Sequence, residues 1–386
     1  MSAERFISRR LRFEGTLVMT SVALSFLVII LAVTVSSGFR HEIRSAAASV
    51  SGDIQISPRT ADYSLEDDPV PAEPSYLEDL KAIEGVRDVS PVIYRTGIVR
   101  SGGTVHGVLF KGTGADTARL GVRIPRHLAL MLSLGEGDSM TAYFVGENVK
   151  VRKWHITQVY DPVLETDASA VVYAPLTDMR RLNGWEEGTA SALEVTMDGS
   201  HRSKSALEEA SSKAGTIIVM QAQDADEELV SIPVNRRWPR LFGWLDLLDF
   251  NVMTVLLLMI AVAAFNMVSG LLIMLFRHIP TIGILKAMGM DNRGVSRVFL
   301  QLSSRLVLKG MAAGNAVSLL FCLVQGCTHF VKLNPENYFV SFVPVHVNLP
   351  WILCADLIAY VAIMLVLLIP CRFISGVDPA RTVKAD

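Results

Sequence analysis

Charged residues are scarce in this chain of 386 residues. Lys, Arg, Asp and Glu together make up 19% of it, whereas apolar residues make up 51%. The mean hydropathy is +0.38. Soluble domains rarely combine these values, so the composition indicates an integral membrane protein with a sizeable polar portion. The net charge of −2 gives no sign of a nucleic-acid partner.

Cysteine is also rare, and none occurs in the long polar region. The four copies lie within or at the ends of apolar C-terminal segments, at Cys322, Cys327, Cys354 and Cys371. We therefore expect no disulfide framework in the polar region, and we interpret the four as small apolar core residues.

Sequence motifs for catalysis are missing as well. The chain has no P-loop, no H-E-x-x-H, no G-x-S-x-G and no Cys/His group with metal spacing. We expect no catalytic residue, no metal site and no cofactor in this chain, although missing motifs alone do not exclude an enzyme.

Four long apolar runs organise the sequence. Residues 250–276 contain 27 residues without a charge, and the other runs are 15–39, 306–331 and 351–371. About 20 apolar helical residues cross a hydrocarbon core of roughly 30 Å, so we expect four transmembrane helices. The first run could instead belong to a cleaved signal peptide, because a basic segment precedes it. Its length and the absence of an A-x-A-like site favour a retained helix.

Residues 40–249 differ in composition from the apolar runs. They carry charges of both signs, Pro and Gly residues that mark turns, and short runs in which apolar and polar residues alternate. They predict an α+β domain, in two lobes, inserted between the first two membrane helices. Two hairpins are expected, 92–100 with 104–112 and 139–145 with 149–159. Helices are expected at 75–84, 175–183 and 201–214.

The distribution of Lys and Arg predicts the orientation. Residues 1–14 carry four arginines at helical spacing with apolar residues, which predicts an amphipathic helix on an anionic membrane face. The loop 277–305 and the tail 372–386 are also basic, whereas the loop 332–350 is nearly neutral. The positive-inside rule then places both termini and 277–305 in the cytoplasm and the domain 40–249 in the periplasm.

A few polar residues fall inside the apolar runs. Asn266 lies in the middle of the second run and Asn315 in the third. We expect each to make a hydrogen bond between helices, and a transport role is the alternative. Lys309 and Asp356 lie near span ends, so we expect their side chains to reach the cytoplasmic and outer interfaces, respectively.

The second apolar run leads directly into a short, basic, amphipathic segment at 277–289. A membrane helix followed at once by a short cytoplasmic helix suggests that a cytoplasmic partner pushes on the short helix and thereby moves the membrane helix.

Several stretches resemble the FtsX-like/MacB-type family of ABC-transporter permeases, and within it the LolC/LolE branch. In chain order they are FISRR (6–10), SGDIQI (51–56), VLFKG (108–112), VRKW (151–154), FNMVS (265–269), ILKAMG (284–289), LIP (368–370) and DPA (378–380). Their order and spacing agree with the predicted topology.

The resemblance implies a permease without ATP chemistry of its own. A separate LolD-like ABC ATPase subunit would bind the ATP, and a second permease subunit, identical or different, would complete the membrane dimer. For the lipoprotein-releasing branch, the substrate would be a triacylated lipoprotein, lifted from the outer leaflet of a Gram-negative inner membrane to a LolA-like periplasmic carrier.

The resemblance also implies a coupling helix that docks on the ATPase. Its residues would be Ile279, Ile282, Gly283, Ile284, Leu285, Lys286, Ala287, Met288 and Gly289. Ile282, Ile284, Leu285 and Met288 would form one apolar face, with Lys286 at its rim. The segment departs from the family at Pro280-Thr281, where a charged pair is usual, and Pro280 is suited to the first helical position.

The predicted turn Gly146-Glu147-Asn148 lies where the resemblance implies a hook for the carrier. It is short and lacks the proline of that hook, so a plain hairpin turn is the alternative. The family also leaves open an FtsX-like transducer that regulates a cell-wall hydrolase, and a MacB-like exporter subunit. A membrane-anchored sensor without an ATPase is a further alternative.

Overall fold

The computed structural model describes residues 16–59, 69–101, 104–115, 118–146, 148–162, 170–221, 229–334 and 338–373. Their contacts divide into two units. The helical unit comprises the described residues of Met1–Arg40, Leu245–Lys332 and Phe342–Asp386. The sheet unit comprises those of His41–Trp244 and Leu333–Ser341. The predicted amphipathic helix 1–14 and most of the tail 372–386 lie outside the described residues.

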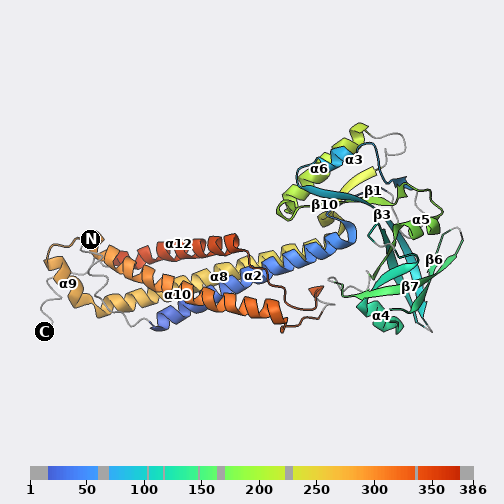
Figure 1. Ribbon diagram of the computed structural model, residues 1–386. Helices are drawn as coiled ribbons and strands as arrows, with labels where there is room; N and C mark the ends of the chain where they lie inside the picture. Colours follow the sequence, from blue (N-terminus) through green and yellow to red (C-terminus); the bar gives the residue numbers. More distant parts are fainter. Residues whose placement is uncertain are drawn as a thin grey trace. The chain divides into compact units, whose positions relative to one another are not determined.

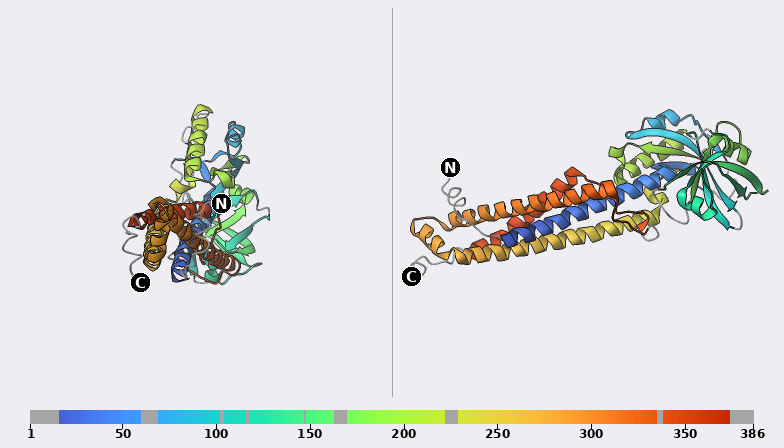
Figure 2. Two further views of the ribbon diagram at one scale, coloured as in Figure 1. Left: turned by 90° about the vertical axis from the view of Figure 1, so that its left-hand side faces the viewer. Right: turned by 60° about the horizontal axis from the view of Figure 1, so that its bottom comes forward.

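Long helices make up the helical unit and run side by side (Figure 1 and Figure 2). They are α2 (Thr16–Ser51), α8 (Pro239–Arg277), α10 (Asn292–Thr328) and α12 (Leu349–Phe373), and the short α9 (Ile279–Ala287) stands between α8 and α10. All four long helices are apolar and long enough to cross a membrane. With the sheet unit inserted between the first two, the predicted fold class is confirmed.

Helix bounds differ from the expected runs, because charge ends a membrane span without ending a helix. α2 continues past residue 39 to Ser51, since residues 40–50 contain no Gly or Pro, and it stops before Gly52, whose φ is +70°. α8 begins at Pro239, eleven residues before the apolar run. The expected loop 277–305 is mostly helical, because α10 already begins at Asn292.

Small residues bring α10 and α2 into close contact. Gly310 and Gly314 form a G-x-x-x-G pattern, and a Cβ atom on Gly310 would lie 2.8 Å from Cγ1 of Val22. A Cβ atom on Gly314 would meet the carbonyl oxygen of Ala23. Small residues allow backbones to approach where the solvent is lipid, so this packing favours a membrane bundle.

The sheet unit contains eleven strands: β1 (Ile54–Pro58), β2 (Val70–Pro71), β3 (Val86–Ser101), β4 (Thr104–Thr113), β5 (Gly121–Pro125), β6 (Ser139–Phe144), β7 (Lys150–Tyr160), β8 (Val171–Pro175), β9 (Thr189–Ala190), β10 (Ala192–Met197) and β11 (Leu229–Pro233). Its helices are α3 (Leu77–Lys81), α4 (Arg126–Leu132), α5 (Leu176–Asn183), α6 (Lys204–Gln221) and α7 (Val234–Arg237).

The long strand β3 takes part in two sheets. Its first half pairs with β10, which continues to β1 and β11, and α3 and α6 pack together beside this sheet. Its second half pairs with both β4 and β6, and the order β3-β4-β8-β5-β7-β6 closes on itself. This ring is a small barrel, and Phe110, Phe144 and Trp154 fill it.

Both predicted hairpins are confirmed by the pairing of β3 with β4 and of β6 with β7. The helix predicted at 175–183 is α5, with Gly184 in the left-handed conformation at its end. The other two were misplaced at their ends: α3 covers only Leu77–Lys81, and α6 starts at Lys204 and continues to Gln221. Their weak start and stop signals account for these errors.

Candidate coupling site

The segment after α8 is a separate short helix because of one proline. Pro280 has no N–H to bond the carbonyl of Phe276, and its ring hinders a continuous helix, so α8 ends at Arg277. The chain restarts as α9 at Ile279, which makes Pro280 the second helical residue and not the first, as expected. Proline is well tolerated in a first turn, where N–H groups have no intrahelical partner.

A Schellman motif ends α9. The N–H of Met290 donates to the carbonyl of Leu285 at 3.0 Å, and the N–H of Gly289 donates to that of Lys286 at 3.0 Å. Gly289 adopts the required positive φ, +91°. α10 then begins at once, because the Asp291 carboxylate accepts from the N–H of Gly294 at 2.8 Å. The two caps leave a tight turn that holds α9 against α10.

The expected single apolar face of α9 is wrong. Ile282 is 1% exposed and Leu285 is 7% exposed, and Ile282 belongs to the core of the helical unit. Ile284 and Met288 are 55% and 70% exposed. The error arose from treating neighbouring positions 284 and 285 as one face, although they lie about 100° apart on a helix.

The exposed side chains of α9 form their own stripe. Pro280, Ile284 and Met288 follow one another at four-residue spacing, and all three are exposed. Ala287 beside them is exposed too, and Lys286 is half-buried. We call Pro280, Ile284, Ala287 and Met288 the outer stripe of α9. The opposite face of α9 is buried, and its C-terminal end is capped. A small apolar surface on such a helix is suited to docking in a groove of another protein.

The turn between β6 and β7 spans residues 145–149, since Phe144 pairs with Lys150. Glu147 lies outside the described residues, and Gly146 and Asn148 lie in the turn. The flanking Val145 and Val149 are 49% and 63% exposed. The base of the turn is fixed because buried Arg95 donates to the carbonyl of Val145 at 2.9 Å. The turn therefore presents apolar side chains on a rigid base, which a purely solvated turn does not need.

The two asparagines of the spans contact other helices. Asn266 of α8 donates to the hydroxyl of Ser21 on α2. Asn315 of α10 donates to Asp356 of α12 at 2.6 Å. The expectation that Asp356 reaches the outer interface is wrong: it is 6% exposed, because α12 begins seven residues earlier and turns this position toward α10.

A buried ion pair that the sequence reasoning missed lies at the end of α2. Nζ of Lys111 (β4) lies 2.8 Å from the carboxylate of Glu194 (β10) and donates to the carbonyls of Ser49 and Val50 at 3.0 Å each. The hydroxyl of Tyr94 (β3) donates to Glu194 as well. Burial raises the pKa of the Glu194 carboxyl, and Lys111 opposes that shift. A charged residue within each of two apolar strands is the signal that could have revealed the pair.

Asp53 holds the next residues after α2. Its buried carboxylate accepts from the N–H of Met197 at 2.8 Å and from Nε of Arg202 at 3.1 Å. Burial raises the pKa of Asp53, and these partners oppose the shift. Nearby, the indole N–H of Trp238, just before α8, donates to the hydroxyl of Ser51 at 3.0 Å. The end of α2 and the start of α8 are therefore bonded to each other inside the sheet unit.

The four cysteines are free, and the described residues contain no cluster of His, Cys, Asp and Glu that could hold a metal ion. Cys322 and Cys371 are buried as expected, whereas Cys327 and Cys354 are exposed. The latter two lie on outward helix faces, so their interpretation as core residues is wrong.

Several known proteins are similar to this chain. A family model, the C-terminal part of FtsX-like permeases, matches residues 253–379, which include α9 and the turn that joins it to α10. The lipoprotein-releasing system transmembrane protein LolC of Xylella fastidiosa strain Temecula1 is 23% identical, over 95% of this chain and 92% of that protein. LolC of strain 9a5c is 22% identical over the same shares.

Two solved structures are similar to part of the chain. The extracellular domain of the noncanonic ABC-type transporter YknZ from Gram-positive bacteria is 13% identical, with a TM-score of 0.31, over 46% of this chain and 98% of that one. The periplasmic region of MacB from Actinobacillus actinomycetemcomitans is 11% identical, with a TM-score of 0.31, over 49% of this chain and 91% of that one.

The helices and the family match define a multi-pass inner-membrane protein of the permease class. Residues 253–379 form an FtsX-like permease C-terminal domain, as the sequence motifs predicted, and LolC proteins are similar to the chain over nearly its whole length.

Proposed function

We propose that this permease is the membrane subunit of a complex that releases lipoproteins from the outer leaflet of the inner membrane. ATP would be bound and hydrolysed in a separate ABC ATPase, and the lipoprotein would pass to a periplasmic carrier. Support for this cargo comes from the two LolC relatives, whose similarity covers 95% of the chain. A second permease subunit would complete the membrane dimer.

The observation that carries the proposal is the outer stripe of α9. Its apolar side chains are exposed, while Ile282 and Leu285 anchor the opposite face of the same helix. An ATPase that bound Ile284 and Met288 would move α9 and the start of α10 together, because the caps at Gly289 and Asp291 hold α9 to α10.

Movement of α9 would be transmitted away from the ATPase through two helices, α8 and α10. α8 is continuous for 39 residues up to and including Arg277, and α10 is continuous for 37 residues after Asp291. Neither helix contains an interior proline, so each is suited to transmit displacement. The basic residues around α9 support its placement in the cytoplasm, with the sheet unit in the periplasm.

For the carrier, we propose the β6–β7 turn with Gly146, Glu147 and Asn148. Exposed Val145 and Val149 on a base fixed by Arg95 support this role. A rigid apolar turn lowers the entropic cost of binding, so the carrier would bind there without ATP-driven movement of the turn.

The test is a pull-down of the full chain from detergent-solubilised membranes, with copurifying proteins identified by mass spectrometry. Ile284→Asp places a charge in the proposed contact without touching the core. Met220→Asp is the matched control, because Met220 is 80% exposed on α6 of the sheet unit. Burial of one Ile is worth about 1.5–3 kcal/mol, so we expect Ile284→Asp to reduce copurified ATPase at least tenfold.

The outcomes separate the alternatives. A P-loop ATPase with acylated lipoproteins in the wild-type and Met220→Asp samples supports the proposal. An ATPase accompanied by a cell-wall hydrolase would instead indicate an FtsX-like transducer. If no sample contains an ATPase, the coupling role of α9 is wrong and a membrane-anchored sensor becomes the better account.

A further inference from the structure

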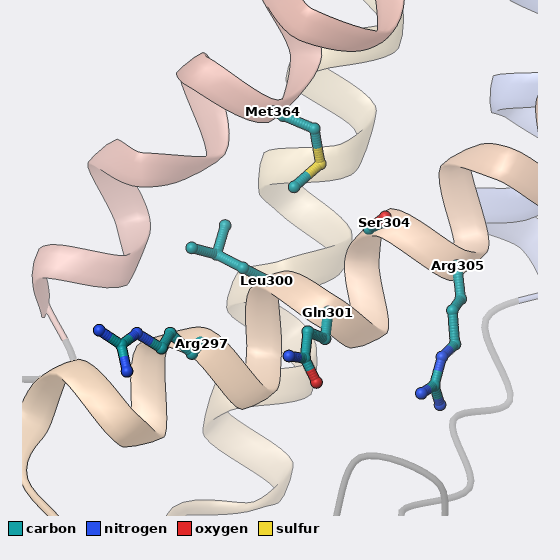
Figure 3. A pocket seen from close by; sticks show the side chains of 6 residues that line it. All are labelled: Arg297, Leu300, Gln301, Ser304, Arg305 and Met364. Atoms are coloured by element: carbon teal, nitrogen blue, oxygen red, sulfur yellow. The ribbon is translucent and has the colours of Figure 1, made fainter. Parts of the chain in front are cut away.

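Hydrogen bonds between side chains link α10 to α12 at two levels. In the half of α10 nearer α9, a cavity of about 390 Å³ lies between the two helices, and Met364 extends from α12 toward α10 (Figure 3). Ser304 lines this cavity, and its hydroxyl lies 2.8 Å from that of Tyr360. About three turns farther along α10, Asn315 donates to the Asp356 carboxyl group of α12 at 2.6 Å. The second link therefore joins an amide and a carboxyl group.

Asp356 lies in apolar surroundings. It is 6% exposed, and Ile352 and Ala359, one turn away on either side, belong to the core of the helical unit. An isolated carboxylate is costly in such surroundings, and the neutral acid is favoured instead. The apolar parts of the four long helices carry no charged residue besides Asp356; these parts are residues 15–39, 250–276, 310–328 and 349–371.

The titratable groups nearest to Asp356 do not supply a counter-ion. Within those apolar parts, α2 and α8 carry no titratable side chain, and α10 and α12 add only cysteine thiols and the Tyr360 hydroxyl. Lys309 of α10 is exposed and lies six residues before Asn315, about 9 Å along the helix axis. His346 lies ten residues before Asp356, in the segment that leads to α12. Among the residues that the structure describes, no charge lies close enough to act on the Asp356 carboxyl group.

Asp249, in the same helical unit, shows how a carboxylate is satisfied there. One of its oxygens accepts from the Ser36 hydroxyl at 2.9 Å, and the other forms an ion pair with Arg40. Asp356 has one bonded oxygen, Oδ2, whereas its Oδ1 is buried without a hydrogen-bond partner in the described part of the chain. Oδ1 of Asn315 is buried without a partner as well. Buried polar atoms are nearly always hydrogen-bonded, and one donor between these two oxygens would satisfy both.

We propose that Asp356 binds a proton and that the resulting O–H group donates to Oδ1 of Asn315. A carboxylic acid offers one donor and one acceptor, and a primary amide offers the complementary pair. The two side chains then bond twice, since Nδ2 of Asn315 donates to Oδ2 of Asp356 in return. Both buried Oδ1 atoms gain a partner, and the apolar span carries no charge. This proton-binding site links α10 to α12, and it is independent of the cargo and of the ATPase.

The bound proton determines how firmly α10 and α12 are linked at this level. Deprotonation breaks the O–H bond of Asp356, and the proton passes to water. Two acceptor oxygens are then left without a donor, and a negative charge remains in the span. Stability that depends on a bound proton is lost as pH rises. Because the caps at Gly289 and Asp291 hold α9 to α10, loss of the proton would free the helix that carries α9 to move relative to α12.

The test is infrared spectroscopy of the purified full chain in detergent at pH 7. A neutral carboxyl group gives a C=O stretching band at a frequency where a carboxylate does not absorb. Asp356→Asn removes the acid and keeps both hydrogen bonds, because an amide can accept from Asn315 and donate to it. Asp249→Asn is the matched control, since it removes an aspartate of the same helical unit that is paired with Arg40.

We expect Asp356→Asn to abolish a carboxylic band of the wild type and Asp249→Asn to leave it unchanged. Asn315→Leu should shift the same band by removing its hydrogen-bond partner, which assigns the band even if Asp356→Asn misfolds. The melting temperature of Asp356→Asn should differ from that of the wild type by less than about 2 °C at pH 6. As pH rises, the wild type should lose stability relative to Asp356→Asn.

Three results would overturn the proposal. The first is a carboxylic band that neither Asp356→Asn nor Asn315→Leu changes, which would make Asp356 a carboxylate. The second is a wild type that gains stability relative to Asp356→Asn as pH rises. The third is a wild-type melting temperature that changes when Na⁺ is exchanged for K⁺ while that of Asp356→Asn does not, which would indicate a metal cation in place of the proton.

Discussion

Replacing Lys111 by Met should strongly destabilise the sheet unit while leaving its shape intact. Met matches the length of the Lys stem, so the change removes a charge and little volume. The ammonium now contacts Glu194 at 2.8 Å and the carbonyls of Ser49 and Val50 at 3.0 Å, with its own side chain 4% exposed. The variant leaves a buried carboxylate and two carbonyls of the last turn of α2 without that donor.

The expected size follows from this burial. Breaking a buried pair by removing one partner costs about 3–5 kcal/mol. For a unit of roughly 200 residues this corresponds to about 6–20 °C in melting temperature. The loss should also depend on pH, because burial raises the pKa of Glu194 above its ordinary value of 4.5. A raised pKa in the folded state favours the protonated form, so its contribution to stability is complete at low pH and is lost as pH rises.

The assay is thermal unfolding of the full chain in detergent, followed by tryptophan fluorescence between pH 4 and pH 8. Lys111→Met should differ least from the wild type near pH 4 and most near pH 8. Lys153→Met is the control, since Lys153 is exposed on β7 and its loss should cost less than about 0.5 kcal/mol. A Lys111→Met melting temperature within 2 °C of the wild type at pH 8 would refute the reasoning.

Two further changes test the helical packing. Gly314→Leu should lower the melting temperature of the bundle and the yield of folded protein, because its Cβ would meet the carbonyl of Ala23. Gly215→Ala is its control: a Cβ there meets nothing within 4 Å, so the helix should gain about 0.5–1 kcal/mol. Asn315→Leu should cost about 1–3 kcal/mol in a detergent unfolding assay by leaving the Asp356 carboxyl group without its donor. Adding Asp356→Leu should restore most of that loss, and no recovery would contradict the assigned pairing.

The sequence was sufficient for the architecture because its strongest signals are long. An apolar run such as 250–276 needs no tertiary information, and the two hairpins carry Gly-containing turns between period-2 strands. The barrel could not be foreseen, since it depends on β3 pairing with both β4 and β6. Helix ends beyond the membrane, such as Ser51, were missed because charge marks the span and not the helix.

The sequence predicted which residues form the coupling helix but not which of their side chains are exposed. The helix stop at Gly289 and the helix start at Asp291 are local signals, yet which side of α9 faces the core depends on its packing against the other helices, where Ile282 is buried. The Lys111–Glu194 pair joins strands more than eighty residues apart, so only the fold could bring the two residues together.

The most direct test of the central claim is photo-crosslinking in living cells. A photoreactive phenylalanine analogue replaces Met288, in the outer stripe of α9, or Val219, which is 80% exposed on α6. The coupling account predicts that a P-loop ATPase crosslinks at Met288 and not at Val219. An ATPase crosslinked equally at both positions, or at neither while the protein is folded in the membrane, would contradict it.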